Sequence, residues 1–389
     1  MPAIYLDNAA TTPLDPRVRA AMKPWIEDRF GNPSSRHRQG QHAAEAVDLA
    51  RAQVARALGA LPAHVIFTSG GTEANNLGVL GSARARAKRG KHVLVGPTEH
   101  PCVRESAAAL LAEGFEVETL RIGADGSLDL AHLEARLRPD TVLVAQMLVQ
   151  NEVGCVYPVR TVARLACARS PHAAVHVDAV QAFGKIEISI GELGADSLAI
   201  SSHKVHGPQG AGALVTRGEI ALKPLVFGGG QEHGLRSGTE NVAAIAGFGR
   251  AAELAAVEMD AARAQFEKLR AACLRGLARI PGARVIEPPS SAGAAPSRVA
   301  AIVAVILPGA PSEVRMHHLE ELGVVVSAGS ACHSHKREAS PAMLAMGVSA
   351  DEARTVLRIS FSRANTEEEV GRAMEALADV TRRLESAPR

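Results

Sequence analysis

The sequence predicts an α/β protein, with a large domain on a mostly parallel seven-stranded sheet and a smaller α+β domain. Short apolar runs recur at residues 64–68, 92–96, 115–120, 141–147, 173–177, 197–201 and 211–216. Segments of helical periodicity, such as 103–113 and 128–137, separate several of these runs. Strands that alternate with helices favour right-handed crossovers and a parallel sheet covered by helices on both faces.

A second alternation of strands and helices occupies the last third of the chain. Residues 241–280 are predicted to form one long, alanine-rich helix, and residues 287–297 are rich in proline, glycine and serine. Strands are then expected at 299–307, 324–327 and 355–361, with helices at 312–322 and from residue 366 onwards. We therefore assign residues 15–255 to the large domain, and residues 1–14 with 256–389 to the small domain.

The composition is that of an ordinary globular protein of 389 residues, of which 47% are apolar and 22% charged. A net charge of +2 favours neither nucleic acid nor an anionic membrane as a partner. No apolar run is long enough to cross a bilayer and residues 1–8 do not resemble a secretory signal, so a cytoplasmic location is expected. The five cysteines lack zinc-binding spacing, and no metal site is expected.

A lysine and an aspartate follow two consecutive predicted strands. Lys204 comes just after the strand 197–201, and a lysine amine that is neutral when it reacts can bond to a carbonyl cofactor. Asp178 follows the strand 173–177, where its carboxylate could pair with the ring nitrogen of pyridoxal phosphate (PLP). A surface turn and a helix N-cap are the plainer explanations. Because one βα repeat separates the two residues, both should lie at the carboxyl edge of the sheet, where ligands bind.

Other predicted strands end in groups that suit the same cofactor. Gly70, Gly71 and Thr72 form a strand-to-helix turn that can hold a single phosphate. His100 could stack on a ring or transfer protons, and Asn151 could donate a hydrogen bond to a phenolic oxygen. Glycine-rich turns, loop histidines and asparagine turns are each common on protein surfaces. Their convergence on one edge of the sheet is what predicts a PLP site.

Cys332 is the candidate nucleophile among the five cysteines. Small residues precede it and basic residues follow it in the segment 333–337, which favours the reactive thiolate over the thiol. Cys155 is the nearest rival, but it adjoins Asn151. The other three lie in or beside alanine-rich helical segments and are interpreted as packing residues: Cys102, Cys167 and Cys273. Arg358, in a later predicted strand, could hold an α-carboxylate in a bidentate grip, although such arginines are often merely solvated.

Eight segments of the chain resemble the NifS/IscS-like cysteine desulfurases of the class V aminotransferase family, in the same order: 5–12, 31–35, 67–76, 98–100, 151–154, 201–204, 236–239 and 329–332. The resemblance extends from the first predicted strand to the last helix. It implies the type I fold of PLP-dependent transferases, which is the fold of aspartate aminotransferase. It also implies PLP as the cofactor, L-cysteine as the substrate, a homodimer, and a sulfur-acceptor protein as a partner.

The resemblance assigns cofactor contacts to ten residues: Gly71, Thr72, His100, Asn151, Asp178, Gln181, Ser201, His203, Lys204 and Thr239. Lys204 would bind the cofactor covalently, with His100 stacked on the ring and Asp178 paired with the pyridine nitrogen. Asn151 and Gln181 would contact the phenolic oxygen. The phosphate would be held by three side chains of the same subunit, with a fourth reaching in from the partner: Thr72, Ser201, His203 and, from the partner, Thr239.

Substrate binding and sulfur transfer follow from the same resemblance. The substrate carboxylate would be bound by Asn8, Asn151 and Arg358. The catalytic groups would be Lys204, His100 and Cys332, which would take the sulfur as a persulfide on a mobile segment at about 327–340. A selenocysteine lyase or another class V aminotransferase is the alternative, and a catalytically silent scaffold would lack the lysine or the aspartate.

The segment 333–339 departs from the family pattern, because it is unusually basic and lacks a proline that relatives often carry. The sulfur acceptor is therefore left open between an iron–sulfur scaffold and a tRNA-thiolation protein, and an acidic acceptor is the hypothesis that the added charge favours.

Overall fold

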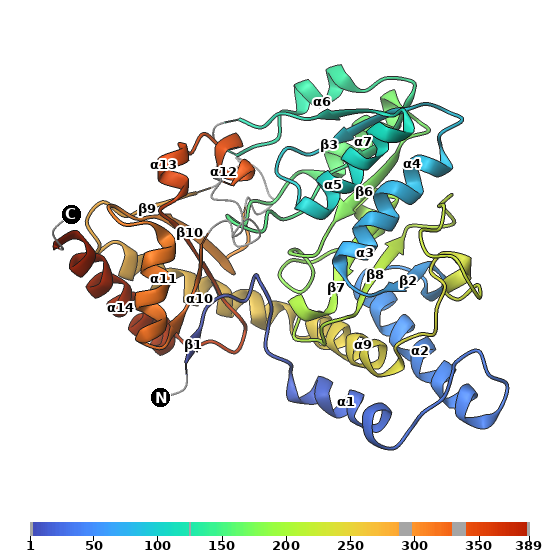
Figure 1. The fold of residues 1–389 in the computed structure, drawn as a ribbon, viewed down its shortest axis with the longest axis horizontal. Helices are drawn as coiled ribbons and strands as arrows, with labels where there is room; N and C mark the ends of the chain where they lie inside the picture. Colours follow the sequence, from blue (N-terminus) through green and yellow to red (C-terminus); the bar gives the residue numbers. More distant parts are fainter. Residues whose placement is uncertain (1–2, 124–125, 288–297, 329–339, 387–389) are drawn as a thin grey trace.

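The computed structural model describes residues 3–123, 126–287, 298–328 and 340–386 (Figure 1). Its largest sheet has seven strands in the order β2-β8-β7-β6-β5-β3-β4. The five strands from β7 to β4 are mutually parallel, and β8 is antiparallel to both of its neighbours. The strands are β2 (Val65–Thr68), β3 (His92–Val95), β4 (Glu116–Thr119), β5 (Thr141–Ala145), β6 (Ala174–Asp178), β7 (Ser197–Ser201) and β8 (Gly212–Thr216). The predicted mostly parallel α/β sheet is thus confirmed.

Helices cover both faces of this sheet, as predicted. They are α1 (Pro16–Glu27), α2 (Arg38–Ala57), α3 (Gly71–Asn76), α4 (Ser82–Ala85), α5 (Pro101–Ala109), α6 (Leu130–Arg136), α7 (Val159–Arg169), α8 (Ile190–Leu193) and α9 (Val242–Val257). A π-helical stretch, Leu77–Gly81, joins α3 to α4 in one helical run. The predicted repeat between Asp178 and Lys204 contains only the four-residue helix α8.

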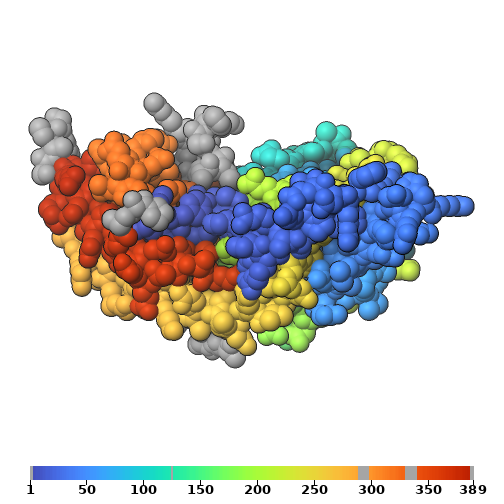
Figure 2. All heavy atoms as spheres, turned by 90° about the horizontal axis from the view of Figure 1, so that it is seen from below, coloured from blue at the N-terminus to red at the C-terminus, as the bar shows by residue number. Residues whose placement is uncertain are grey.

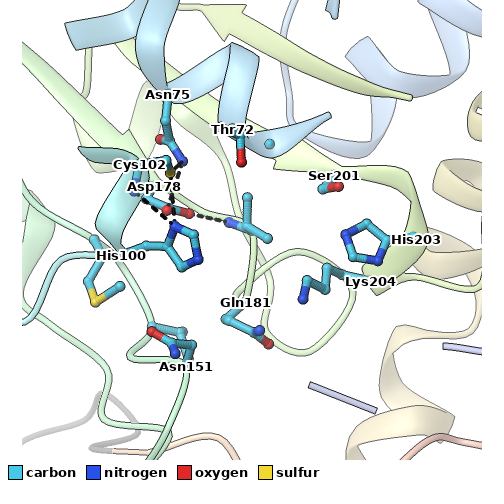
Figure 3. A pocket seen from close by; sticks show the side chains of 14 residues that line it. Thr72, Asn75, His100, Cys102, Asn151, Asp178, Gln181, Ser201, His203 and Lys204 are labelled. Carbon is cyan, nitrogen blue, oxygen red and sulfur yellow. Dashed lines mark hydrogen bonds between the residues drawn. The ribbon is translucent and has the colours of Figure 1, made fainter. Parts of the chain in front are cut away.

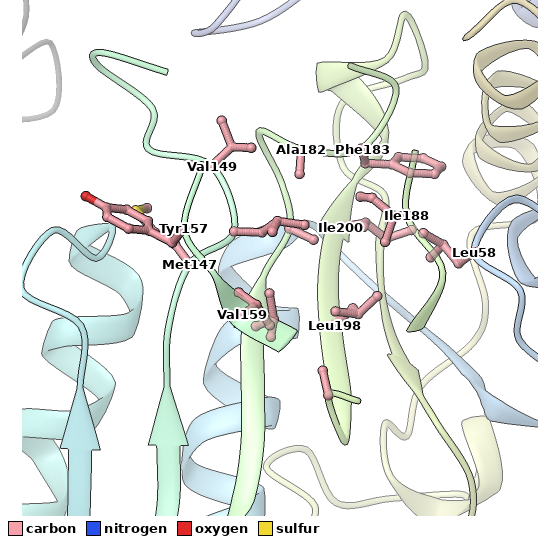
Figure 4. Packing of buried hydrophobic residues seen from close by; sticks show 14 of the residues in the cluster. Leu58, Met147, Val149, Tyr157, Val159, Ala182, Phe183, Ile188, Leu198 and Ile200 are labelled. Atoms are coloured by element: carbon pink, nitrogen blue, oxygen red, sulfur yellow. The ribbon is translucent and has the colours of Figure 1, made fainter. Parts of the chain in front are cut away.

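Alternate strand residues pack on opposite faces of the sheet, as the period of two in a β-strand requires. Leu198 and Ile200 of β7 belong to the core cluster that includes residues of α2, α7 and α9, and Figure 4 shows them beside Leu58 and Ile188. On the other face, Val93 of β3 belongs to a separate cluster with residues of α5. Both faces are therefore covered mainly by apolar side chains, and His176, in the middle of β6, is a buried polar exception.

The smaller part has a four-stranded antiparallel sheet in the order β12-β13-β10-β9 and a two-stranded parallel pair, β1-β11. These strands are β1 (Ile4–Tyr5), β9 (Arg284–Val285), β10 (Ile302–Ile306), β11 (Val324–Val325), β12 (Ser327–Ala328) and β13 (Val356–Ser360). The helices are α10 (Met259–Leu277), α11 (Ser312–Glu321), α12 (Pro341–Ala345), α13 (Ala350–Ala353) and α14 (Glu367–Ser386). A separate apolar cluster lies between α10, α14 and the sheet.

The start of the chain runs from the small part to the large one. β1 pairs with β11, and the Leu6 amide bonds to Val325 at 2.8 Å. Residues 9–15 then lie against the large part, where Thr12 donates from its hydroxyl to the His203 carbonyl at 2.8 Å. Figure 2 shows this dark blue segment crossing between the orange-red and the blue parts of the surface. Residues 4–15 therefore link both parts of the molecule.

The predicted long helix over 241–280 is wrong in one respect, because it consists of two helices that break at Glu258. This residue has φ −95° and ψ 7°, outside helical geometry. Its carboxylate pairs with Arg17 at 2.5 Å and with Arg363 at 3.2 Å, one residue from each part of the molecule. The break occurs where the chain passes from α9, packed on α1 and α2, to α10, packed on α14. Periodicity alone does not reveal this change of partner.

Within the described ranges, no helix combines the length and the apolar character that crossing a bilayer demands.

We predict that Gly249→Ala destabilises the protein. A Cβ atom on Gly249 of α9 would lie 2.5 Å from Cα of Ala50 and 2.6 Å from its Cβ, so α2 and α9 would have to move apart. Overpacking of this kind costs about 1–3 kcal/mol, and the midpoint of thermal unfolding should fall. Gly371→Ala is the matched control, since nothing lies within 4 Å of its Cβ in α14, and it should stabilise by about 0.5–1 kcal/mol. Equal midpoints for the two variants would contradict this account.

Candidate active site

One cavity of about 220 Å³ lies where β2, β5, β6 and β7 end, and it contains nine of the predicted cofactor residues (Figure 3). Those nine are Gly71, Thr72, His100, Asn151, Asp178, Gln181, Ser201, His203 and Lys204. Parallel strands present their carboxyl ends at one edge of the sheet, which brings these distant residues together. Five further residues that the sequence did not single out also line it: Asn75, Cys102, Met147, Val149 and Val180.

One end of the cavity suits a phosphate group. A Cβ atom on Gly71 would lie 2.8 Å from Cγ2 of Val180 and 3.3 Å from Cβ of Ser201, so only glycine allows this close approach. The Ser201 hydroxyl is buried and has no hydrogen-bond partner within the described part of the chain. Burial first, then the nearby Lys204, lowers the pKa of His203 to about 4, so its imidazole is neutral near pH 7. A buried hydroxyl without a partner beside an open turn fits a ligand oxygen.

At the other end, the Asp178 carboxylate is held in one orientation. Its Oδ1 accepts the Val180 amide at 2.9 Å, and its Oδ2 accepts from Nδ2 of Asn75 at 2.8 Å. Burial raises the pKa of Asp178, while the charges of His100 and Lys204 and these two hydrogen bonds oppose the rise. Asn75 lies four residues after Gly71, one helical turn into α3. That spacing is the signal that could have identified it from the sequence.

Two more buried side chains hold Asn75. Its Oδ1 lies 2.9 Å from Nε2 of His176, and Nδ1 of His176 lies 2.8 Å from the Ser197 hydroxyl. Complete burial lowers the pKa of His176 to about 3, so the ring is neutral. Because Asn75 uses its amide to donate to Asp178, its oxygen must accept, and His176 carries its proton on Nε2. In each hydrogen bond of the chain Ser197–His176–Asn75–Asp178 the donor and the acceptor are therefore fixed.

His100 and Cys102 form the wall beside Asp178. The backbone amide of Cys102 donates to Nδ1 of His100 at 3.2 Å, which makes His100 the N-cap of α5. The Cys102 sulfur lies 3.0 Å from the same Nδ1 and 3.3 Å from Nδ2 of Asn75. Cys102 belongs to a buried apolar cluster, as predicted for a packing residue, and it has these polar contacts as well. Cys167 is exposed, contrary to the same prediction, whereas Cys273 is buried in the small part as expected.

The Lys204 amine lies on the opposite side of the cavity from His100 (Figure 3). It donates to the carbonyls of Ala9 and Ala10, each at 2.6 Å. Gln181 also donates to the Ala9 carbonyl, at 2.8 Å, and its own Oε1 is buried without a partner among the described residues. Residues 9 and 10 thus hold two side chains of the cavity, Lys204 and Gln181, in position.

Three other predicted residues, Asn8, Thr239 and Arg358, do not line this cavity. Arg358 is buried in β13, between β12 and β10, where it pairs with Asp7 at 2.8 Å. Its Nη1 donates to the Asn151 carbonyl at 3.1 Å, so it contacts the cavity wall from behind. Asn8 donates to the Ser360 carbonyl at 3.0 Å. Thr239 is exposed, and Cys332 lies outside the described residues.

The sequence profile of the family described as "Aminotransferase class-V" matches residues 4–372, nearly the whole chain. The chain belongs to the class-V aminotransferase family. Within it, the chain is 39% identical over 382 residues to "Cysteine desulfurase IscS 1" of Archaeoglobus fulgidus, covering 98% of each protein. It is 41% identical to "Cysteine desulfurase IscS" of Anaeromyxobacter sp., covering 98% of this chain and 93% of that protein. These relatives place it among the NifS/IscS-like members.

The solved structures agree with this placement of the chain in the class-V family. The structure titled "NifS-like protein" superposes with a TM-score of 0.90 at 35% identity, covering 97% of this chain and 99% of that one. The predicted type I fold of PLP-dependent transferases is thereby confirmed, together with the resemblance on which it was based.

We expect acid to destabilise the protein through His176. Its pKa is about 3 when folded against an ordinary 6.5. Below pH 6.5 the unfolded chain binds a proton that the folded chain does not, so this contribution is complete above pH 6.5 and is lost as the pH falls toward 3. The loss is about 1.4 kcal/mol per pH unit. Urea unfolding between pH 7 and 4 would measure it.

His176→Gln should flatten this acid dependence while it lowers the stability at pH 7. His318→Gln, a half-exposed position on α11, is the control and should leave the slope unchanged. The same slope in all three proteins would show that His176 titrates normally.

Proposed function

We propose that this protein is a PLP-dependent cysteine desulfurase, which converts L-cysteine to L-alanine and receives the sulfur as a persulfide on Cys332. The observation that carries this proposal is the arrangement of Lys204 and Asp178 in one cavity, with a phosphate-sized polar end beside Gly71. Relatives named cysteine desulfurases, nearly 40% identical over the whole chain, support the same activity.

The cavity residues fit PLP group by group. Lys204 would bind the aldehyde, Asp178 the ring nitrogen, and Thr72, Ser201 and His203 the phosphate. Two buried oxygens that have no partner in the described part of the chain fit such a ligand: the Ser201 hydroxyl can donate to a phosphate oxygen, and Oε1 of Gln181 can accept from a phenolic hydroxyl. When bound, PLP supplies an electron-accepting ring that stabilises negative charge on the substrate α-carbon.

The chain's own residues then perform binding and proton transfer. The Lys204 amine must leave the Ala9 and Ala10 carbonyls to act, and as a free base it takes the α-proton of the substrate. Asp178 would pair as a carboxylate with the ring nitrogen; burial raises its pKa, and the nearby charges of His100 and Lys204 and its two hydrogen bonds oppose that rise. His100, against the ring face, would hold or deliver a proton at the carbon that loses sulfur.

Substrate binding would use Arg358, assisted by Asn8 and Asn151. In the described structure Arg358 is paired with Asp7, and its Nε is buried without a partner there. A substrate carboxylate would therefore compete with Asp7 for the guanidinium, or share it through the remaining N–H groups. Binding of the carboxylate by Arg358 would select an α-amino acid over a thiol that has no carboxylate.

The sulfur transfer balances without an added oxidant or reductant. The Cys332 thiolate attacks the substrate sulfur, an S–S bond forms, and the C–S bond of the substrate breaks. The carbon keeps the bonding electron pair and takes a proton, so that L-cysteine and the Cys332 thiol yield L-alanine and a persulfide. We propose that an acceptor protein then takes this sulfur for iron–sulfur cluster assembly or tRNA thiolation, and that the basic segment 333–339 favours an acidic acceptor.

We also propose a cytoplasmic homodimer in which Thr239 contacts the phosphate of the partner's site. Large apolar side chains are exposed on two segments: Ile26 at 66%, Phe30 at 80% and Phe227 at 81%. Phe227 lies in the segment of the chain that leads to Thr239. A paired subunit would cover such side chains, which monomeric proteins rarely expose together.

We predict that Cys332→Ser abolishes alanine and sulfide production from L-cysteine but leaves the bound chromophore in place. The serine hydroxyl cannot accept sulfur as a thiolate does. Lys204→Ala should lose both the activity and the covalently bound chromophore. Activity falls by at least about a thousandfold in each, because each variant lacks a covalent participant. Alanine is measured by chromatography, sulfide by colorimetry, and the chromophore by absorbance.

The alternatives give different results. A class-V aminotransferase would keep its activity in Cys332→Ser, and a selenocysteine lyase would release selenide from selenocysteine in that variant. Cys167→Ser, at an exposed cysteine of α7, is the matched control and should behave as wild type.

Mixed dimers test the contribution of Thr239. We expect Thr239→Asp to repel the phosphate and Lys204→Ala to lack the reactive amine, so that each protein alone is inactive. In a randomly reassembled mixture about half of the dimers are mixed, and half of the sites in those are intact. The mixture should therefore recover about a quarter of the wild-type activity. No recovery, with mixed dimers shown by native mass spectrometry, would place Thr239 in its own subunit's site.

A further inference from the structure

Cys102 occupies a position in the cavity that the desulfurase reaction does not require. It is the second residue of α5, its side chain lines the cavity, and it is nearly buried at 9% exposure. Its sulfur contacts two polar side chains, His100 and Asn75, from two different helices or their caps (Figure 3). A thiol placed only for packing would not be expected to have two such contacts.

The hydrogen-bond donors around the Cys102 sulfur can be assigned by starting from groups that always carry a hydrogen. The Asn75 amide carries two hydrogens, of which one goes to Asp178 at 2.8 Å and the other points to the Cys102 sulfur at 3.3 Å. The sulfur therefore accepts from Asn75. Its own hydrogen remains available for the atom on its other side, Nδ1 of His100 at 3.0 Å.

Nδ1 of His100 must accept in this arrangement. The backbone amide of Cys102 always carries a hydrogen, and it donates to Nδ1 at 3.2 Å. A hydrogen on Nδ1 would oppose both this N–H and the S–H of the same residue. The neutral ring therefore carries its proton on Nε2, and Figure 3 shows that edge of the ring turned into the cavity.

The Cys102 thiol remains protonated near pH 7. Burial, reinforced by the Asp178 charge, raises the pKa of Cys102 to about 12. A thiolate is needed both for nucleophilic attack and for accepting sulfur. Cys102 is therefore a hydrogen-bond donor in this cavity and is inert as a second sulfur acceptor.

We propose that Cys102 is a positioning residue, whose S–H is a second donor to Nδ1 of His100 and, together with the backbone amide of the same residue, keeps the exchangeable ring proton on Nε2, facing the substrate. Its effect on turnover rests on the proposed desulfurase function, whereas its effect on the His100 proton does not. The thiol also links His100 to Asn75. The hydrogen-bonded chain Ser197–His176–Asn75 therefore continues to the His100 ring, which would lie above the cofactor.

Nitrogen-15 NMR of the holoenzyme with labelled histidine tests the proton position directly, with His100→Gln used to assign the signal. We expect wild type to show an unprotonated Nδ1 and a protonated Nε2 at His100. Cys102→Ala keeps the backbone amide but loses the S–H donor, so Nδ1 should stay unprotonated while its signal shifts toward that of a more weakly hydrogen-bonded nitrogen, and Cys102→Ser, whose hydroxyl can donate in the same place, should restore the wild-type signal. A protonated Nδ1 in wild type, or identical spectra for wild type and Cys102→Ala, would overturn the proposal.

Steady-state kinetics supply the second measurement. Loss of one hydrogen bond to the ring should lower kcat of Cys102→Ala by roughly three- to tenfold with KM unchanged, and Cys102→Ser should stay within about twofold of wild type. An unchanged kcat, or extra sulfur on Cys102 found by mass spectrometry after turnover, would contradict the assignment. If wild type forms no alanine, the proposed function fails while the NMR result still decides the role of Cys102.

Discussion

The buried carboxylate of Asp178 is the charge on which the catalytic cavity depends. A carboxylate in this position is costly unless hydrogen bonds and opposite charges compensate for the lost water. The amides of Val180 and Asn75 do so here, together with His100 and Lys204. Each of these groups comes from a different strand end or from a helix that packs on the sheet. The parallel arrangement of the strands is what allows these groups to meet at a single edge.

The same constraint explains which site residues could be predicted from the sequence. Asp178, Lys204, His100 and the Gly71 turn each follow a predicted strand directly, so strand order alone places them together. Asn75 could not be predicted in this way, because it acts from one turn inside a helix and its partner lies about a hundred residues away. Its role depends on the packing of α3 against β6, which periodicity does not specify.

Cys102, Arg358 and Glu258 show a second limit of prediction from sequence. Each has a local pattern with a plain explanation: a packing thiol, a solvated arginine, and the interior of a long helix. The structure instead gives each one a specific partner outside its own segment, namely Asn75, Asp7 and Arg363. The first pair depends on how α3 packs against α5, and the other two depend on contacts between residues more than a hundred positions apart. The fold class, the strand positions and most of the cavity were predictable because they depend on local pattern and strand order.

The contact of Ala9 and Ala10 with Lys204 has a consequence for how the molecule folds. The segment that carries these residues depends on much later ones, because β1 needs Val324–Val325 as its partner and Asn8 needs Ser360. Contacts between residues more than three hundred positions apart form late, because closing so long a loop is entropically costly. The large sheet can fold during synthesis, but the backbone that contacts Lys204 cannot adopt its final position until residues 324–325 and 360 have also been synthesised. The reactive amine is therefore enclosed last, which leaves the cofactor an open path to it while the protein matures.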